Sequence, residues 1–565
     1  MIALFFSSIL SLYLFIIFGT FIAKIGKFPT DLTEKILIGL VVTNTITASL
    51  SLFLPINIYI LIALLIGCSV LVFFIRDEIN TLFYSLQKKK NVILYTLPFI
   101  LIAFIISIGP PQLWDAGLYH IQSIKWIEEF AVVPGLANLH GRFGFNPNIF
   151  TVFALTSLFE IFKQEIFSIN FILFSVFVLY FINQLYIIYK QYGINNLFVF
   201  NIVVFIAILY FSSNLTDPTP DFISLTFPLF ILSKLFKYAV LKENKNLDAY
   251  IPMLILCVYV LTVKLAVLPV VILPVLIFFK FRTETRKLIW IMSFFSIIML
   301  PWLIRNVVIS GWLIYPFQSL DLFSFDWKVP IDNVIKEKLT VTGWARSPGE
   351  HYWAAAKMHI NEWFPIWWNR LILTDKVEFL ASLFSPLIVF IGYLVKKIKI
   401  DLNTFSFLLI PFIGVLFWLI LAPDLRFGKT FVITAAISPL LYLKFQFKFD
   451  HYNTKYFKPI YVFFAVIIIL VPLFDSFSKK YFGSDIIQIT QKSPNRIITP
   501  QLIERPANMN FKTFDVSGIK IFIPADKSED RCFDHCIPCI PGHNSSVRLR
   551  KKTLQSGFIY ITDNN

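Results

Sequence analysis

Residues 2–23 read IALFFSSILSLYLFIIFGTFIA, a run of apolar and small residues without a single charge. A helix of about 20 such residues crosses the hydrocarbon core of a bilayer. No basic residue precedes the run, and the first lysine, Lys24, follows it. This order differs from that of a cleaved signal peptide, so we expect a retained span with its N-terminus outside the cytoplasm.

The rest of the chain has a similar composition. Of the 565 residues, 57% are apolar and only 15% are charged, whereas soluble domains carry about 25% charged residues. This balance excludes a large soluble enzyme and a disordered chain. The runs lack β-barrel alternation, so the sequence predicts an all-α polytopic membrane protein with about 13–14 transmembrane helices. We expect them at about 2–23, 36–54, 56–75, 93–109, 167–189, 195–211, 222–238, 249–263, 266–281, 288–309, 379–395, 403–422, 430–444 and 459–474.

The net charge of +16 gathers in a few segments between these runs. The seven basic segments are 24–35, 76–92, 190–194, 234–248, 280–287, 396–401 and 444–458. They hold 23 of the 50 Lys and Arg but only 9 of the 34 Asp and Glu, so the remaining chain is nearly neutral. Because Lys and Arg favour cytoplasmic loops, we expect these segments inside. No basic face is left for a nucleic acid.

That orientation leaves three long polar regions outside. They are the first loop, about 110–166, a second loop, about 310–378, and the tail from about 475. The sequence therefore predicts a transmembrane domain, 1–474, and a small β-containing extracytoplasmic domain, 475–565. Long loops between elements usually carry function, so we expect the site on this outer face.

The first loop contains the segment Trp114-Asp-Ala-Gly-Leu-Tyr-His120. Apolar residues then recur at helical spacing through Ile127, which predicts an amphipathic helix in the headgroup plane. A second apolar stretch, 148–165, ends in charged residues and is expected to be a half-inserted helix. Asp115 lies in the first turn of the first helix, where the helix dipole stabilises a carboxylate. It is either a functional carboxylate or only a helix cap.

This arrangement resembles the GT-C superfamily of membrane glycosyltransferases, which carry an acidic residue in the first outer loop between two interfacial helices. The segments 114–120 and 133–144 are similar to a largely uncharacterised bacterial family of GT-C-like multi-spanning proteins. The likeness continues at 301–316, 326–330, 344–346 and 422–428 and in the cysteine-containing tail. The resemblance implies a bacterial inner-membrane enzyme that uses a polyprenyl-phosphate-linked sugar. The charge distribution puts both of its termini outside.

Transfer from such a donor needs a base for the acceptor hydroxyl and cations for the departing phosphate. The resemblance assigns the base to Asp115. No second acid lies within two residues of it, so we expect a cationic, metal-free phosphate site and no required cofactor. The candidate cations are Arg305, Lys264, Arg426, Arg142 and Arg346.

Two of these cations have a simpler alternative. Lys264 is the only charge between two apolar runs, and it either meets a lipid phosphate or reaches up to the headgroups. Arg426 either meets the phosphate or pairs with Asp424, two residues before it. Arg305 lies at the outer end of a span, where an ionisable group is a functional candidate by default.

Further polar candidates come from the loops. Asp221, at the end of Asp217-Pro-Thr-Pro-Asp221, either faces Asp115 and shifts its pKa as a like charge or belongs to an ordinary turn. His120 and His140 either bind donor or acceptor or serve as structural histidines.

The tail contains three cysteines, Cys532, Cys536 and Cys539, in the spacing of an iron–sulfur motif of radical enzymes. A short outer tail does not fit such a cluster, and an oxidising compartment favours a disulfide over a structural metal site. The related tails carry a cysteine, six residues and then Pro-Cys. That likeness implies a pair between Cys532 and Cys539, with Cys536 left over.

We therefore expect an inverting glycosyltransferase that moves a sugar from a polyprenyl-phosphate-linked donor to a glycan or glycolipid acceptor at the membrane lipid surface. One rival is a polysaccharide polymerase or ligase acting on lipid-linked glycans, which would rely on Arg and His of its large loop. Another is a transporter or flippase for such lipids. Transporters place charges near mid-membrane, and the predicted spans hold almost none, so this rival is weaker.

Overall fold

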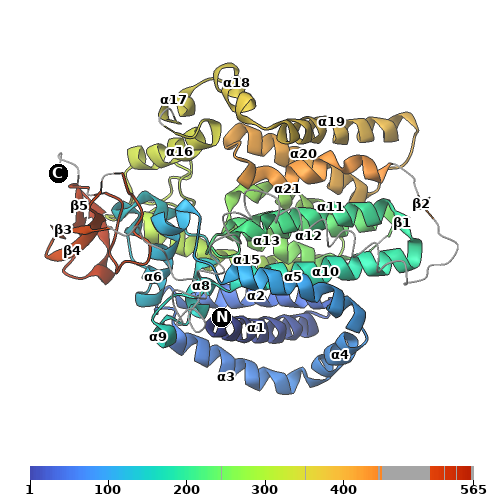
Figure 1. Cartoon of the computed structure of the whole chain (residues 1–565), viewed down its shortest axis with the longest axis horizontal. Helices are drawn as coiled ribbons and strands as arrows, with labels where there is room; N and C mark the ends of the chain where they lie inside the picture. The colour runs from blue at the N-terminus through green and yellow to red at the C-terminus, as the bar shows by residue number, and fades with distance from the viewer. Residues whose placement is uncertain are drawn as a thin grey trace.

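The computed structural model of the chain describes residues 1–243, 245–349, 352–442, 446–447, 509–526, 528–542 and 544–561. Most of these residues are helical, and many of the long helices run side by side along the long axis of the molecule (Figure 1). The helices of the first half are α1 (Ile2–Gly26), α2 (Leu32–Leu50), α3 (Ile58–Phe74), α4 (Arg76–Gln87), α5 (Lys90–Ser107), η1 (Ala116–His120), α6 (Ile121–Glu129), α7 (Leu136–Leu139), η2 (Gly141–Phe145), α8 (Phe150–Thr156), α9 (Phe159–Phe162), α10 (Ile169–Tyr192), α11 (Asn196–Tyr210) and η3 (Phe211–Asn214).

The second half continues the helical bundle and then changes to strands. Its helices are α12 (Asp221–Val240), η4 (Leu247–Ala249), α13 (Ile251–Val263), η5 (Leu265–Val271), α14 (Ile272–Lys280), α15 (Thr285–Ser310), α16 (Ile331–Arg346), α17 (Tyr352–Lys357), α18 (Ile360–Arg370), α19 (Leu373–Val395), α20 (Leu402–Leu421), α21 (Leu425–Ala436), η6 (Ser438–Leu441) and η8 (Leu554–Ser556). The strands are β1 (Ile194–Asn195), β2 (Gln446–Phe447), β3 (Phe511–Val516), β4 (Ile519–Pro524), β5 (Val547–Leu549) and β6 (Phe558–Tyr560).

Seven helices of the described chain are long and apolar enough to cross a membrane. They are α1, α5, α10, α12, α15, α19 and α20. The number rises to eight if α3 and α4, which meet at a bend of 89°, form one broken span. The polytopic helical membrane protein is thus confirmed, whereas the described helices provide fewer spans than the 13–14 that the sequence predicts.

The difference has a physical cause. Three predicted spans, 195–211, 249–263 and 266–281, are apolar helices of only 10–17 residues. Every residue of α13 is buried, and a helix that is apolar on all sides can lie inside the protein as well as in lipid. The predicted span 430–444 overlaps α21, which has 12 residues. The predicted span 459–474 lies outside the described residues.

The basic segments come together at one end of the bundle. The ion pair Lys24–Glu78 joins basic segment 24–35 to segment 76–92, and Lys234–Asp31 joins segment 234–248 to segment 24–35. The ion pair Lys287–Asp248 joins segment 280–287 to segment 234–248. Strand β1 pairs with β2, which joins the third basic segment to the seventh. The N-terminus and the C-terminal strands lie toward the opposite end (Figure 1). The bundle therefore has one basic end and one end that carries the first loop and the C-terminal strands.

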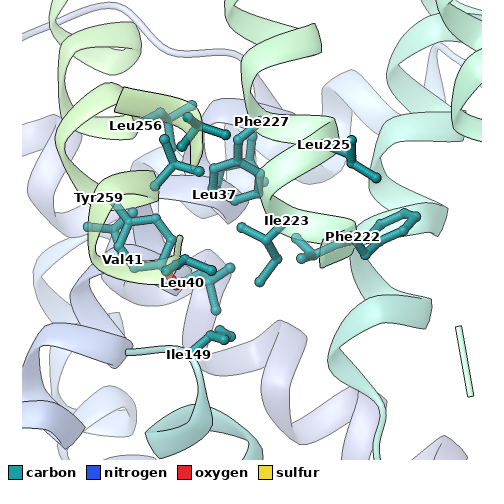
Figure 2. Packing of buried hydrophobic residues seen from close by; sticks show 14 of the residues in the cluster. Leu37, Leu40, Val41, Ile149, Phe222, Ile223, Leu225, Phe227, Leu256 and Tyr259 are labelled. Atoms are coloured by element: carbon teal, nitrogen blue, oxygen red, sulfur yellow. The ribbon is translucent and has the colours of Figure 1, made fainter. Parts of the chain in front are cut away.

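The interior is filled by aliphatic and aromatic side chains from helices far apart in the sequence. Figure 2 shows residues of α2, α12 and α13 around one point of this core: Leu37, Leu40, Val41, Phe222, Ile223, Phe227, Leu256 and Tyr259. Helices α1 and α2 meet closely at Gly39, where a Cβ would lie 1.7 Å from the carbonyl oxygen of Phe15. Close approach at small residues is how membrane helices gain packing energy without a hydrophobic drive.

The first predicted interfacial helix differs from expectation in its surroundings. It consists of the π-helical turn η1 and α6, and both faces of α6 are buried, including Gln122, Lys125 and Glu128. Gln122 donates to the carbonyl oxygens of Phe533 and His535, at 3.1 and 2.8 Å. The C-terminal domain therefore covers the polar face that the sequence pattern assigns to the headgroup plane.

The second predicted interfacial helix, 148–165, is two short helices, α8 and α9, and every residue of α8 is buried. This segment is therefore not the single half-inserted helix that the sequence predicts. Backbone of the preceding turn is held to α13, because the N–H of Asn148 donates to the carbonyl oxygen of Thr262 at 2.9 Å. Helix α8 is therefore part of the protein core, whereas no residue of α9 is buried.

The C-terminal domain contains two antiparallel hairpins in its described part, β3–β4 and β5–β6. This confirms the predicted small β-containing tail for residues 509–526, 528–542 and 544–561; the preceding tail residues, 475–508, lie outside the described residues. Strand β6 docks on the first loop, since the N–H of Phe558 donates to the carbonyl oxygen of Pro134 at 2.9 Å. The domain is thus anchored to the membrane bundle by backbone contacts.

Candidate functional site

The start of the first loop is fixed by a buried carboxylate from another part of the chain. The backbone N–H groups of Gln112 and Leu113 both donate to Oδ1 of Asp217, at 2.9 and 2.8 Å. Asp217 is fully buried in the connection between α11 and α12. The two residues just before Trp114 and Asp115 are therefore held in place by a segment about 100 residues farther along the chain.

Asp217 does more than the turn chemistry that the sequence suggested. Its Oδ2 accepts a hydrogen bond from the Thr216 hydroxyl at 2.9 Å. Burial raises the pKa of Asp217 from 3.8 to about 7, although its hydrogen bonds to Leu113, Thr216 and Gln112 favour the ionised form. The sequence does not predict this role, because an Asp before a proline does not show which backbone N–H groups its carboxylate will accept.

The Asp115 side chain is not used to cap its helix. Asp115 occupies the N-cap position of η1, yet its carboxylate makes no capping hydrogen bond. The side chain is 32% exposed, and Oδ2 lies 3.6 Å from Nη1 of Arg426. Of the two alternatives for Asp115, the simple helix cap is not the one in the structure.

Arg426 is held by Asp424 and directs one nitrogen toward Asp115. Asp424 accepts bonds from the backbone N–H, Nε and Nη2 of Arg426, at 2.9, 3.1 and 3.0 Å. Burial lowers the pKa of Arg426, but the carboxylates of Asp424, Asp221 and Asp115 outweigh it and raise the pKa. Arg426 is thus paired with Asp424, which is one of the two alternatives predicted from the sequence. Its Nη1 also lies near the Asp115 carboxylate.

Two buried tryptophans support the loop that carries Asp424. The indole N–H of Trp418 donates to the carbonyl oxygen of Asp424 at 2.6 Å. The indole N–H of Trp367 donates to the carbonyl oxygen of Pro423 at 2.7 Å, and the two indoles pack edge to face. Because both donors are saturated within the protein, these rings fix the backbone at the start of α21.

A second ion pair lies beside the first. Lys264 Nζ donates to Oδ1 of Asp221, and the ammonium also lies 4.0 Å from the centre of the Phe427 ring. Lys264 is the residue at which α13 ends, with extended backbone before η5. Since Phe427 follows Arg426 in the chain, both ion pairs meet at the start of α21. The counter-charge of Lys264 is therefore a protein carboxylate.

His120 lies behind these charges as a neutral side chain. It is buried, with its ring against Tyr119 and Phe150. Burial lowers the pKa of His120 to about 4, although Asp115 and Asp221 oppose the change. Near neutral pH the imidazole is therefore uncharged.

We call Asp115, Asp221, Asp424, Lys264, Arg426 and His120 the carboxylate–arginine cluster. Its three carboxylates and two cations leave it with one net negative charge when His120 is neutral. The described residues thus provide an acidic cluster with one half-exposed arginine, where the sequence predicted a cationic pocket. Within the described chain, no group of three or more His, Cys, Asp or Glu side chains has the arrangement of a metal site.

Two other candidates, Arg142 and His140, lie in the neighbouring turn of the first loop. Nε of Arg142 lies 2.9 Å from a carboxylate oxygen of Glu337 on α16, which joins the first loop to the second. His140 is partly buried beside Phe143, and desolvation lowers its pKa to about 3. Arg142 is therefore neutralised by a partner of its own, and His140 is uncharged.

The remaining candidates, Arg305 and Arg346, contact neither Asp115 nor Arg426. Arg346 donates to the carbonyl oxygens of Ala355, Ala356 and Met358 at 3.2–3.3 Å, which closes the turn after α16. Arg305 is buried on α15 and bonds to Asn146 and Ser51. The structure thus brings together Asp115, Asp221, Lys264, Arg426 and His120 and leaves Arg142, His140, Arg305 and Arg346 in separate roles.

The segment around Asp115 is covered by residues 529–539 of the C-terminal domain, here called the cysteine loop. The indole N–H of Trp114 donates to Oδ1 of Asp530 at 2.9 Å, and the guanidinium of Arg531 lies 3.8 Å from the Trp114 ring centre. The carbonyl oxygen of Gly117 accepts from the N–H groups of Cys532 and Phe533, both at 2.9 Å. The cysteine loop therefore binds the chain on both sides of Asp115.

A disulfide closes the cysteine loop. It joins Cys532 to Cys539, the pair that the resemblance implies, and Cys536 is an exposed free thiol. The N–H of Ile540 donates to the carbonyl oxygen of Phe522, next to this disulfide. Strand β4 and the disulfide together hold the loop in the shape that meets Gly117.

Comparison with known proteins gives one relationship. No curated protein and no solved structure matches the chain. The family described as Domain of unknown function (DUF8201) matches residues 1–433, which contain the whole carboxylate–arginine cluster and none of the C-terminal domain. Since the match covers far more than half of the sequence, the chain belongs to the family described as Domain of unknown function (DUF8201).

Proposed function

We propose that the protein is a membrane glycosyltransferase of the GT-C type, which moves a sugar from a polyprenyl-phosphate-linked donor to a glycan or glycolipid acceptor. The observation that carries the proposal is the Asp115 carboxylate. It is one-third exposed, is not used as a cap, and lies 3.6 Å from the guanidinium of Arg426. A base and a phosphate-binding cation are the two groups that this reaction requires side by side.

In the proposed reaction, Asp115 takes the proton of an acceptor hydroxyl. The acceptor oxygen forms a bond to the anomeric carbon of the sugar while the bond from that carbon to the phosphate oxygen breaks. The electron pair of the broken bond leaves with the lipid phosphate. One displacement of this kind inverts the anomeric carbon. A positioned general base contributes typically 10²–10⁴-fold to such a step.

Arg426 supplies the charge that the leaving phosphate meets. Asp424 occupies Nε and Nη2, so the guanidinium is oriented and its Nη1 is left for the site. Asp221 and Lys264 neutralise each other nearby, and a neutral His120 adds no repulsion toward a cation. The cluster has one carboxylate more than it has cations. A divalent cation brought with the donor would offset this negative charge, so the transfer rate should be measured both with EDTA and with Mg²⁺.

The rival polymerase or ligase would use Arg and His of the second loop. The one arginine of that loop that the sequence put forward, Arg346, donates to three backbone carbonyls and lies over the Trp363 ring at 4.8 Å. Its donors therefore serve the local turn. This supports the first-loop carboxylate as the reacting group.

The test compares purified wild type with Asp115→Asn in nanodiscs. Each is given radiolabelled polyprenyl-phosphate sugars and a lipid-linked acceptor, and Asp332→Asn serves as the control because Asp332 is an exposed carboxylate at the start of α16. We expect Asp115→Asn to lose about 10²–10⁴-fold in transfer rate with an unchanged melting temperature, and the control to keep wild-type transfer. Transfer that survives in Asp115→Asn would remove this carboxylate from the reaction.

A further inference from the structure

Arg305 is a charged side chain in the interior, away from the carboxylate–arginine cluster. It lies one turn before the end of α15 and is only 3% exposed. Its Nε donates to Oδ1 of Asn146 at 3.1 Å, and its Nη1 donates to Oγ of Ser51 at 2.5 Å. The Asn146 amide nitrogen donates to Asn306, so Asn146 presents its oxygen to the guanidinium. Both partners of Arg305 are therefore neutral acceptors.

Nothing in the described chain compensates this charge. No Asp or Glu of the described residues lies within 4.0 Å of Arg305, whereas Arg142 and Arg426 each have a carboxylate partner. A guanidinium does not escape the cost of burial by losing its proton, because it stays charged in proteins. A buried ion without a partner is strongly unfavourable. The charge of Arg305 thus requires an anion from outside the described chain.

A cavity lies directly beside the guanidinium. Its volume is about 30 Å³, it is partly open, and it is lined by side chains of the first loop and α15. The lining includes Arg305, Asn146, Ser123, Trp126, Phe150 and Ile309. The indole N–H of Trp126 is buried and has no acceptor among the described residues. Three residues with donor groups, Trp126, Arg305 and Ser123, therefore line one small cavity.

We propose that this cavity binds one small monovalent anion, with chloride as its ordinary occupant. A cavity needs about 10–15 Å³ to hold a water molecule, so this one accommodates a single monatomic ion. It does not accommodate a phosphate that carries a lipid and a sugar. A water molecule would accept the hydrogen bonds but leave the charge of Arg305 uncompensated. The anion site is therefore distinct from the donor phosphate role that the sequence suggested for Arg305.

The anion would also explain why this part of the first loop is ordered. The cavity walls come from α6, from the segment after it up to Phe150, and from α15. An ion bound to both Arg305 and Trp126 would join α6 to α15. Occupancy should thus stabilise the folded protein whether or not the protein transfers a sugar.

The test is the melting temperature of the purified full-length protein in detergent. Wild type is heated in mixtures of potassium chloride and potassium gluconate at constant ionic strength, because gluconate is too large for the cavity. We expect the melting temperature to rise with chloride and then saturate, as it does for any ligand that binds only the folded state. An identical melting temperature in both salts would overturn the proposal.

Two variants assign the effect to this cavity. Trp126→Phe keeps the ring and removes one donor, and we expect about a tenfold higher chloride midpoint, the cost of one hydrogen bond to a charged group. Arg305→Gln should abolish the chloride effect, while Arg370→Gln, an exposed arginine on α18, should keep it. A chloride midpoint unchanged in Trp126→Phe overturns the proposal even if Arg305→Gln does not fold.

Discussion

Replacing Asp217 with asparagine is expected to stabilise the folded protein at pH 8 and to change it little at pH 4. The asparagine oxygen still accepts the backbone N–H groups of Gln112 and Leu113, which Oδ1 of Asp217 accepts now. The Thr216 hydroxyl, which now donates to Oδ2, can rotate and accept from the new amide. The substitution therefore removes a buried charge and keeps the hydrogen bonds that hold the first loop.

The size of the effect follows from the pKa of Asp217. Its ordinary value is 3.8, and burial raises it to about 7 in the folded protein. The folded state binds the proton of the Asp217 carboxyl more tightly than the unfolded chain does. Protonated Asp217 therefore stabilises the folded protein in full below about pH 4, and this stabilisation is lost as the pH rises to 7. Each pH unit corresponds to about 1.4 kcal/mol. A separation of about three pH units gives about 4 kcal/mol, the largest advantage of asparagine over aspartate at pH 8.

The assay is reversible unfolding in mixed micelles, followed by tryptophan fluorescence at pH 4 and pH 8. Comparing variants at each pH cancels the other carboxylates of the protein. Asp217→Ala is the matched control, because it leaves three donors without an acceptor and should cost about 1–3 kcal/mol for each at both pH values. If asparagine is as destabilising as alanine, or gives no advantage at pH 8, the account of Asp217 as a buried, proton-binding anchor is refuted.

Two further predictions concern packing and the cysteine loop. Gly39→Leu should lower the melting temperature strongly, because a side chain there meets the backbone of Phe15, whereas Gly67→Leu, with open space around its Cβ position, should not; equal effects would contradict the close α1–α2 contact. Reducing the Cys532–Cys539 bridge should cost about 2–3 kcal/mol of loop stability, because its ends are seven residues apart. We expect faster hydrogen exchange at residues 114–125, and unchanged exchange there would show that the cysteine loop does not order the Asp115 segment.

The sequence predicts those features that depend on composition or on neighbouring residues. The membrane class follows from the apolar runs, and the grouping of basic segments at one end follows from where lysines such as Lys24 and Lys234 stand between those runs. Asp115 is put forward because the resemblance places an acidic residue in the first outer loop, and its functional role stays a prediction. The pairing of Arg426 with Asp424 is visible because the two residues are two positions apart.

The features that the sequence does not predict depend on distant parts of the chain. Lys264 could be seen as an isolated cation, but its partner Asp221 lies 43 residues away. The polar face of α6 looks like a surface for headgroups, because nothing local shows that Gln122 will meet the cysteine loop. Among the described residues, the predicted spans outnumber the helices long enough to cross a membrane, in part because α13 is as apolar as a lipid-facing helix while being buried. In each case the missing information is which elements become neighbours.

The contacts between the cysteine loop and the Asp115 segment also have a consequence for biosynthesis. Trp114 and Gln122 bond to residues more than 400 positions downstream, so a ribosome must add more than 400 further residues before these partners exist. A nascent chain, or one cut before residue 529, carries the described helices α1 to α21 but leaves the Asp115 segment without the cysteine loop. The Asp115 segment is therefore covered only after residues 529–539 have been made and have reached the same side of the membrane as the first loop.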